Sequence, residues 1–190
     1  MRIILASQSK RRQELLKNQL HLDFEVIVSD SDEILDPNLS TLDNCINISY
    51  QKAKDVLEKT EGDRIIISCD TIVLKDNKIY GKPKTKEDAY NILKLLSNTS
   101  HEVLSCLTVI KVENNKVEEY KTYGKGIVYI DEMTDSEIYD WILDGNPYDK
   151  AGGYAIQEGF GKFVNKIEGD FYSIVGLPLN KLYNILKKIN

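Results

Sequence analysis

The chain has 190 residues, of which 42% are apolar and 29% are charged. These values predict one soluble globular domain over residues 1–190. They exclude disordered, collagen-like and disulfide-dense proteins. A net charge of −5 disfavours binding to duplex nucleic acid, and the lack of both a signal peptide and an apolar run of about 18 residues predicts a cytoplasmic protein without membrane contacts. Cys45, Cys69 and Cys106 are scattered and form no C-x-x-C pair, so we expect reduced thiols and no cysteine zinc site.

The first half of the chain alternates between strand-like and helix-like segments. Ser9 is a suitable N-cap for the first helix, and Asp76-Asn77 is typical of a tight hairpin turn. Apolar periodicity and β-branched runs predict the remaining boundaries. We expect strands over 2–6, 24–28 and 64–68, helices over about 10–20 and 41–59, an acidic loop over 29–40, and a hairpin that joins 71–75 to 78–80.

The second half of the chain contains longer strands and clearer helix caps. Thr85 is an expected cap, Asn114-Asn115 is another turn signal, and Thr134-x-x-Glu137 is a capping box. We expect helices over about 85–96 and 134–145 and from Leu177-Pro178 onward, long strands over 101–112 and 116–131, and short strands over 154–157 and 162–167. Because helices alternate with strands that include hairpins, we predict an α/β fold with a mixed sheet flanked by helices.

The segment Ser7-Gln8-Ser9-Lys10-Arg11-Arg12 is the first candidate site. It joins a strand to a helix start, where free N–H groups and the helix dipole favour an anion such as phosphate. Two of the four arginines stand here, and arginine offers a planar fork of donors. The alternative is a capped helix with a solvated basic first turn, but cations are disfavoured at a helix N-terminus. The pattern therefore favours an anionic ligand.

Carboxylates form the second group of candidates. Asp70 follows a buried strand, a position where α/β proteins place ligand and metal groups. The alternative for Asp70 is an Asx turn. Glu33 stands in the acidic loop with Asp30 and Asp32, and such carboxylates suit Mg²⁺ bound together with substrate phosphates. For the acidic loop alone, a solvated turn is the better interpretation.

Two later loops complete the candidates. Lys82 stands between Gly81 and Pro83, which constrains its position, and the stretch from Asp149 to Gln157 combines charges with two glycines. Either loop could contact a ligand, and either could be a structural turn, with an Asp149–Lys150 pair in the second. Cations for a polyphosphate together with carboxylates for a metal and a water molecule indicate phosphoryl or nucleotidyl hydrolysis.

In chain order, these segments resemble the Maf family of nucleoside triphosphate pyrophosphatases. The resemblance extends from the first strand to the last helix and depends on the whole ordered set. The matching segments are Leu5-Ala6-Ser7-Gln8-Ser9-Lys10-Arg11-Arg12, Asp32-Glu33, Lys52-Ala53, Asp70-Thr71, Gly81-Lys82-Pro83, Asp149-Lys150-Ala151-Gly152-Gly153-Tyr154 with Ile156-Gln157, and Val175-Gly176-Leu177-Pro178-Leu179.

The resemblance implies a fold like that of the inosine triphosphatases, with a deep cleft, and often a homodimer. It implies hydrolysis of a nucleoside triphosphate to the monophosphate and pyrophosphate with Mg²⁺ or Mn²⁺. Asp70 matches the catalytic acid, taken as the base, and Glu33 its partner carboxylate at the metal. The positions that match those holding the triphosphate are Ser7, Arg11, Arg12, Lys52 and Lys82; Asp149 and Lys150 fall in the late substrate-binding loop.

Arg12, Thr71 and Gln157 match the members of the family that act on dTTP and UTP. Lys10, where the family usually has proline, departs from the pattern and could alter the geometry of the phosphate loop. The family is also associated with inhibition of septum formation, so a regulator of cell division that only binds nucleotides is the alternative from another class. A house-cleaning pyrophosphatase for another modified nucleotide is the alternative within the class.

Overall fold

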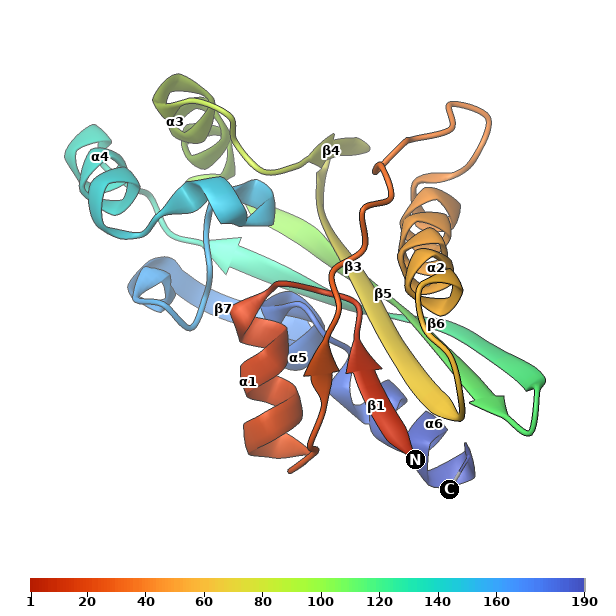
Figure 1. Ribbon diagram of the computed structural model, residues 1–190. Coiled ribbons are helices and arrows are strands. Elements are labelled where there is room, and N and C mark those ends of the chain that lie inside the picture. Colours follow the sequence, from red (N-terminus) through yellow and green to blue (C-terminus); the bar gives the residue numbers. More distant parts are fainter. Residues whose placement is uncertain (190) are drawn as a thin grey trace. The chain divides into compact units, whose positions relative to one another are not determined.

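The computed structural model describes residues 1–189, and the chain divides into two compact units (Figure 1). Unit 1 contains residues 1–70 and 105–124 and the chain from residue 176 onward, and unit 2 contains residues 71–104 and 125–175. Three strands contribute residues to both units: β3 (Arg64–Lys75), β5 (Ser100–Glu113) and β6 (Lys116–Ile130). The single domain over residues 1–190 stays a prediction.

In unit 1, β1 (Arg2–Leu5) lies between β2 (Glu25–Val26) and β3 and is parallel to both. The register pairs Ile4 with Glu25 on one side and with Ile66 on the other. The β-branched run of β3 is fully buried, as expected for a strand that is covered on both faces. Asp70 was expected to follow this strand, but it lies within β3, which continues to Lys75, and it is the last residue of β3 in unit 1.

The helices of unit 1 are α1 (Lys10–Gln19), α2 (Thr41–Glu58) and α6 (Leu179–Ile189). Ser40 caps α2, because its hydroxyl accepts a hydrogen bond from the backbone N–H of Asp43. Ala53 and Val56 of α2 pack with Ile4, Ile66 and Ile110 in one apolar cluster. This packing fixes the face of α2 that carries Lys52.

In unit 2, the last residues of β3 turn back into β4 (Lys78–Tyr80) as an antiparallel hairpin. Asp76 and Asn77 have φ angles of 50° and 60°, the left-handed conformation that a tight hairpin turn requires at both positions. β7 (Val164–Gly169) pairs with β6 in antiparallel fashion, and β6 is connected to β5 through a similar turn at Asn114 and Asn115. The strand order through residues 1–189 is β2-β1-β3-β5-β6-β7, with β4 on β3, so the predicted mixed sheet is confirmed.

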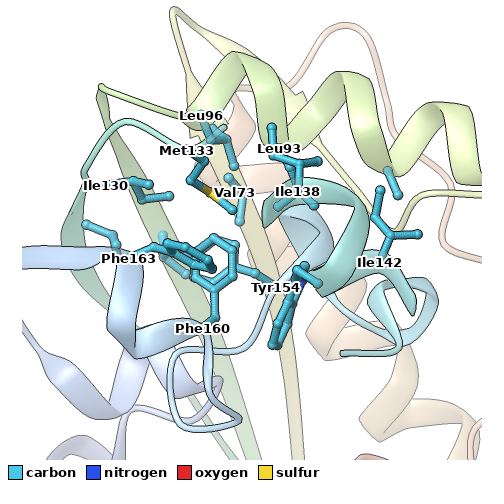
Figure 2. Packing of buried hydrophobic residues seen from close by; sticks show 14 of the residues in the cluster. Val73, Leu93, Leu96, Ile130, Met133, Ile138, Ile142, Tyr154, Phe160 and Phe163 are labelled. Atoms are coloured by element: carbon cyan, nitrogen blue, oxygen red, sulfur yellow. The ribbon is translucent and has the colours of Figure 1, made fainter. Parts of the chain in front are cut away.

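The two long helices of unit 2, α3 (Lys86–Leu96) and α4 (Asp135–Asp144), lie side by side (Figure 1). Each begins with a complete capping box, Thr85 with Asp88 in α3 and Thr134 with Glu137 in α4. Their inward faces join an apolar cluster that includes Tyr154 and Phe160 (Figure 2). This cluster anchors the chain that follows α4.

Several elements differ from the sequence predictions, and the strands expected over 64–68 and 71–75 are one continuous strand, β3. The strand expected over 24–28 is only the two residues of β2, and the strand expected over 154–157 is wrong. The latter segment forms a turn closed by a hydrogen bond from the Glu158 N–H to the Ala155 carbonyl (3.1 Å). The turn lies between Gly153 and Gly159, whose φ angles of 76° and 87° are left-handed and incompatible with an extended strand.

The remaining chain of unit 2 is built from short 3₁₀ turns and one short helix. The strand predicted over 162–167 is present as β7 but is preceded by a 3₁₀ turn, and the helix α5 was not expected. These elements are η1 (Pro147–Asp149), η2 (Ala151–Gly153), η3 (Phe160–Phe163) and α5 (Phe171–Val175). None of the helices within residues 1–189 is long and apolar enough to cross a lipid bilayer.

Candidate active site

The start of α1 is organised around the hydroxyl of Ser7. This hydroxyl accepts hydrogen bonds from the Ser9 backbone N–H (3.2 Å) and from Nη1 of Arg12 (3.1 Å). Ser9 occupies the predicted N-cap position, but its side chain makes no capping hydrogen bond. Ser7, two residues earlier, therefore orders the loop that the sequence identified as a phosphate site.

Arg12 is held in place at both ends of its guanidinium. Besides its contact with Ser7, its Nε donates to the backbone carbonyl of Gly176 at 2.9 Å. The first turn of α1 contains no acidic residue, and Arg11 is partly buried beside Arg12. The helix start thus combines two arginines with the positive end of the helix dipole, an arrangement that favours a bound anion.

Asp70, Lys52 and Glu33 form a compact ion network in unit 1. The ammonium of Lys52 lies 2.8 Å from Oδ1 of Asp70 and 2.7 Å from Oε1 of Glu33. The side chains of Asp70 and Lys52 are only 10% and 14% exposed, whereas that of Glu33 is 50% exposed. Lys52 therefore contacts both predicted catalytic carboxylates at once, the buried one from β3 and the half-exposed one from the acidic loop.

The charge of Lys52 is secured by its partners. Burial lowers the pKa of Lys52, but the charges of Asp70 and Glu33 and their hydrogen bonds outweigh burial, so the pKa of Lys52 lies above its ordinary value. The ammonium stays protonated at neutral pH. Its positive charge lies between two carboxylates that would otherwise repel each other.

Glu33 and Asp70 could also hold a divalent cation. Within residues 1–189 no group of three or more histidine, cysteine or acidic side chains is arranged to hold a metal ion. Mg²⁺, however, is commonly bound by one or two carboxylates and takes its other ligands from phosphates and water. The pair fits such a cation once Lys52 shifts from between the two carboxylates toward a negatively charged ligand.

The Gly176 carbonyl connects the arginine site to the strand that carries Asp70. It accepts from Nε of Arg12 at 2.9 Å and from the thiol of Cys69 at 3.3 Å, and Cys69 directly precedes Asp70. One backbone oxygen therefore joins the N-terminus of α1 to Cys69 of β3. The anion site contacts the strand at the residue that precedes Asp70.

Three buried thiols surround this end of β3. The thiol of Cys45 on α2 lies 3.7 Å from the Asp70 carbonyl and 3.9 Å from its Oδ2. A hydrogen bond with Cys106, followed by burial, raises the pKa of Cys45 well above its ordinary value. Burial raises the pKa of Cys69 to about 12. The expectation of reduced thiols agrees with three unpaired cysteines.

In unit 2, the structure brings together the Lys82 loop and the late glycine loop. The N–H of Gly152 donates to the carbonyl of Gly81 at 3.0 Å, and Gly153 lies against Pro83. Gly152 and Gly153 have φ angles of 70° and 76°, which a residue with a side chain rarely adopts. The chain can therefore approach the Lys82 loop closely, and Lys82 itself is exposed.

The other predicted residues of unit 2 are spread over β3 and the late loop. Thr71 is partly buried on β3, directly after Asp70, so successive side chains point to opposite faces of the strand. Asp149 and Gln157 are exposed, whereas Lys150 is buried. Within unit 2, the structure therefore groups Asp149 and Lys150 directly and places Gln157 in the turn that follows.

Several features of these units were not apparent in the sequence. In unit 1 they are the thiols around Asp70 and the Gly176 carbonyl. In unit 2, Nε2 of His101 lies 2.6 Å from the Tyr154 hydroxyl, and Nδ1 of His101 has no hydrogen-bond partner within the described chain. Burial, with the nearby charge of Lys75, lowers the pKa of His101 to about 4. A lone histidine at a strand start gives no sequence signal for such a pair.

Comparison with known proteins identifies the family. The sequence profile described as Maf-like protein matches residues 2–189. The chain belongs to the Maf family. Among its relatives in this family are two named dTTP/UTP pyrophosphatase. The protein from Clostridium botulinum (strain Eklund 17B / Type B) is 46% identical over 189 residues, which are 99% of each chain. The protein from Alkaliphilus metalliredigens is 44% identical over 98% of this chain and 95% of its own.

The Maf chain is also similar in fold to a solved structure of a HAM1 protein from Coxiella burnetii. The TM-score is 0.53, with 17% sequence identity over 99% of each chain. At this identity the likeness concerns the fold alone, and it agrees with the predicted mixed sheet flanked by helices. The predicted deep cleft stays a prediction.

Proposed function

We propose that this Maf protein hydrolyses dTTP and UTP to the nucleoside monophosphate and pyrophosphate. The observation that carries the proposal is the junction at Gly176, where the Arg12 anion site meets Cys69 of β3, the residue before Asp70. A triphosphate bound to the N-terminus of α1 would then lie one residue along β3 from a buried carboxylate. The names of the relatives at 44–46% identity support the same substrates.

Each group has a distinct part in the proposed reaction. Ser7, Arg11 and Arg12, with Lys82, neutralise and orient the triphosphate, because arginine forks match phosphate oxygens. Asp70 accepts the proton of the water molecule that attacks the α-phosphorus, and pyrophosphate leaves. Lys52 keeps Asp70 and Glu33 in position until a phosphate oxygen provides another partner for its ammonium.

We also propose that Glu33 and Asp70 bind Mg²⁺ or Mn²⁺ together with the phosphates. The ion would supply charge stabilisation at the oxygens that become negative during the reaction. Support comes from the two carboxylates, both of which contact the ammonium of Lys52, at 2.7 and 2.8 Å. A divalent cation could replace that partner without leaving like charges uncompensated.

Removal of divalent cations should therefore abolish pyrophosphate release. We expect hydrolysis of dTTP in excess chelator to fall to the uncatalysed background and to return when Mg²⁺ or Mn²⁺ is added beyond the chelator. The control is the chelator already saturated with Mg²⁺, which should leave the rate unchanged. Full hydrolysis in free chelator would refute the metal role of Glu33 and Asp70.

Replacement of Arg12 by lysine should weaken catalysis although the charge is kept. Lysine cannot contact Ser7, Gly176 and a phosphate with a single planar fork. We expect kcat/KM for dTTP to fall by about 10- to 100-fold, since a hydrogen bond to a charged group contributes about 1.5–3 kcal/mol. Steady-state kinetics on the purified variant measure this change.

Arg2→Lys is the matched control for this experiment. Arg2 makes a bidentate pair with Glu25 at 2.7 Å, and both side chains are substantially exposed. Its replacement removes an arginine fork from the same unit at a surface site, where ion pairs contribute little. If Arg12→Lys behaves like Arg2→Lys, the arginines at α1 belong to a solvated surface.

Chromatographic product analysis tests the proposed function as a whole. Release of pyrophosphate and the monophosphate from dTTP or UTP is expected. A nucleotide-binding regulator of cell division would release none, and a house-cleaning enzyme would prefer another modified triphosphate. The cytoplasmic location, the homodimer, the lack of binding to duplex nucleic acid and the link to septum inhibition stay predictions.

A further inference from the structure

The ammonium of Lys150 is buried and fully occupied by protein acceptors. Its side chain is 3% exposed, and Nζ lies 2.8 Å from the Asn146 carbonyl, 2.7 Å from Oδ1 of Asp149 and 3.1 Å from Oε2 of Glu158. An ammonium has three N–H donors, so three acceptors satisfy it. Lys150 therefore has little capacity to bind a phosphate directly, although its motif suggests a role with substrate.

The contact with Glu158 leads to the turn that carries Gln157. The backbone N–H of Glu158 closes this turn on the Ala155 carbonyl at 3.1 Å, with Ile156 and Gln157 as the central residues. The amide of Gln157 also lies 3.5 Å from Oε1 of Glu158. One end of the Glu158 carboxylate thus contacts Lys150, and the other contacts Gln157.

The far side of the turn is fixed by the apolar core of unit 2. Tyr154 stacks on Phe160 (Figure 2) with ring centroids 4.4 Å apart. The hydroxyl of Tyr154 also contacts His101. Gly161 leaves no room for a side chain, because a Cβ there would lie 2.9 Å from the Ile156 carbonyl. The backbone on both sides of Gln157 is therefore anchored by packing. The Glu158 side chain, in contrast, is held by its ion pair with Lys150 and contacts the Gln157 amide.

We propose that Lys150 is a positioning residue for base selection. It holds Glu158, and through Glu158 the turn of Gln157, so that the Gln157 amide presents its donor and acceptor to the pyrimidine edge in one orientation. This inference rests on the proposed pyrophosphatase function. Lys150 contributes to the discrimination between bases but does not bind the triphosphate, which contacts the α1 site and Lys82.

Two variants interrupt the connection at different points. Lys150→Met keeps the length of the side chain and removes the ammonium, and Glu158→Gln keeps the shape and weakens the ion pair. Lys166→Met is the matched control, because Lys166 pairs with Glu168 on the surface of the same unit. Each variant is assayed for kcat/KM with UTP and with CTP, for inhibition by inorganic tripolyphosphate, and for thermal unfolding.

The expected result is a change in specificity without a change in phosphate binding. A displacement of a reacting or recognising group by about 1 Å can cost about 100-fold. The ratio of kcat/KM for UTP over CTP should therefore fall by about 10- to 100-fold in Lys150→Met and Glu158→Gln. The inhibition constant of tripolyphosphate should stay at the wild-type value, and Lys166→Met should change neither quantity.

Three results would overturn the proposal. Equal losses for UTP and CTP with weaker tripolyphosphate inhibition would show that Lys150 binds phosphate itself. An unchanged ratio of kcat/KM for UTP over CTP in folded Glu158→Gln would refute the positioning role, even if Lys150→Met fails to fold. A wild-type enzyme that cleaves UTP and CTP equally would overturn both the proposed pyrimidine specificity and the positioning role. If the wild type prefers UTP and the variants keep the same UTP/CTP ratio of kcat/KM, only the positioning role is refuted.

Discussion

Asp70→Asn should lower kcat for dTTP by about 10²- to 10⁴-fold, the contribution expected of a general base. Asparagine keeps the shape of the side chain, and its oxygen can still accept from Lys52, which lies 2.8 Å from Oδ1 of Asp70 in the wild type. It cannot accept a proton from water at neutral pH. The measurement is single-turnover hydrolysis of dTTP, which separates the chemical step from product release.

Asp76→Asn provides the matched control for that substitution. Asp76 is an exposed turn residue with a φ angle of 50°, a conformation that asparagine also tolerates. This variant should retain wild-type kcat. If Asp70→Asn, shown to be folded by its thermal transition, also turns over at the wild-type rate, Asp70 is not the base.

Discrimination among bases should be the largest effect. Uracil and thymine present an acceptor at O4 and a donor at N3–H, whereas cytosine presents the reverse pattern. A site whose polar groups pair with one pattern leaves them unpaired with the other, which can reject the wrong partner by up to about 10⁴- to 10⁵-fold. We therefore expect CTP and the purine triphosphates to be much poorer substrates than dTTP and UTP.

Thr71 and Gln157 are the side chains proposed to read this pattern, with Arg12 as the third specificity position. The 5-methyl group of thymine should matter less, because a methyl group in an apolar pocket contributes roughly 1–3 kcal/mol. Values of kcat/KM for all common triphosphates, measured by pyrophosphate release, provide the test. Comparable values for UTP, CTP and GTP would mean that the protein does not distinguish the bases.

The sequence predicted those elements whose signals are local. The turns at Asp76-Asn77 and Asn114-Asn115 and the capping box at Thr134 were located correctly, because each depends on the conformational preference or hydrogen bonding of a few adjacent residues. The prediction of a strand over 154–157 was wrong, although three of its four residues are apolar. Tyr154 has extended backbone angles, but the turn closed between Ala155 and Glu158 and the left-handed glycines on either side prevent a strand there.

For the candidate site, the sequence names candidate residues but not the contacts between them. Motifs identified Asp70, Glu33 and Lys52 separately, and only the three-dimensional structure shows that Lys52 bridges the two carboxylates. Lys150 was predicted to bind substrate, yet its ammonium is buried among three protein acceptors. One of them is Glu158, eight residues further along a loop without regular periodicity. Such contacts across a loop leave no repeating pattern in the sequence.

The three thiols around Asp70 give unit 1 an intrinsic reporter of its own opening. Alkylating reagents attack the thiolate; burial blocks access to all three thiols, and the raised pKa values of Cys45 and Cys69 keep these two protonated. Labelling of the native chain must then wait for α2 or the adjoining strands to separate, so its rate measures the free energy of that local unfolding. A nucleotide that binds next to Asp70 would slow the labelling by its own binding free energy, without any probe having been introduced.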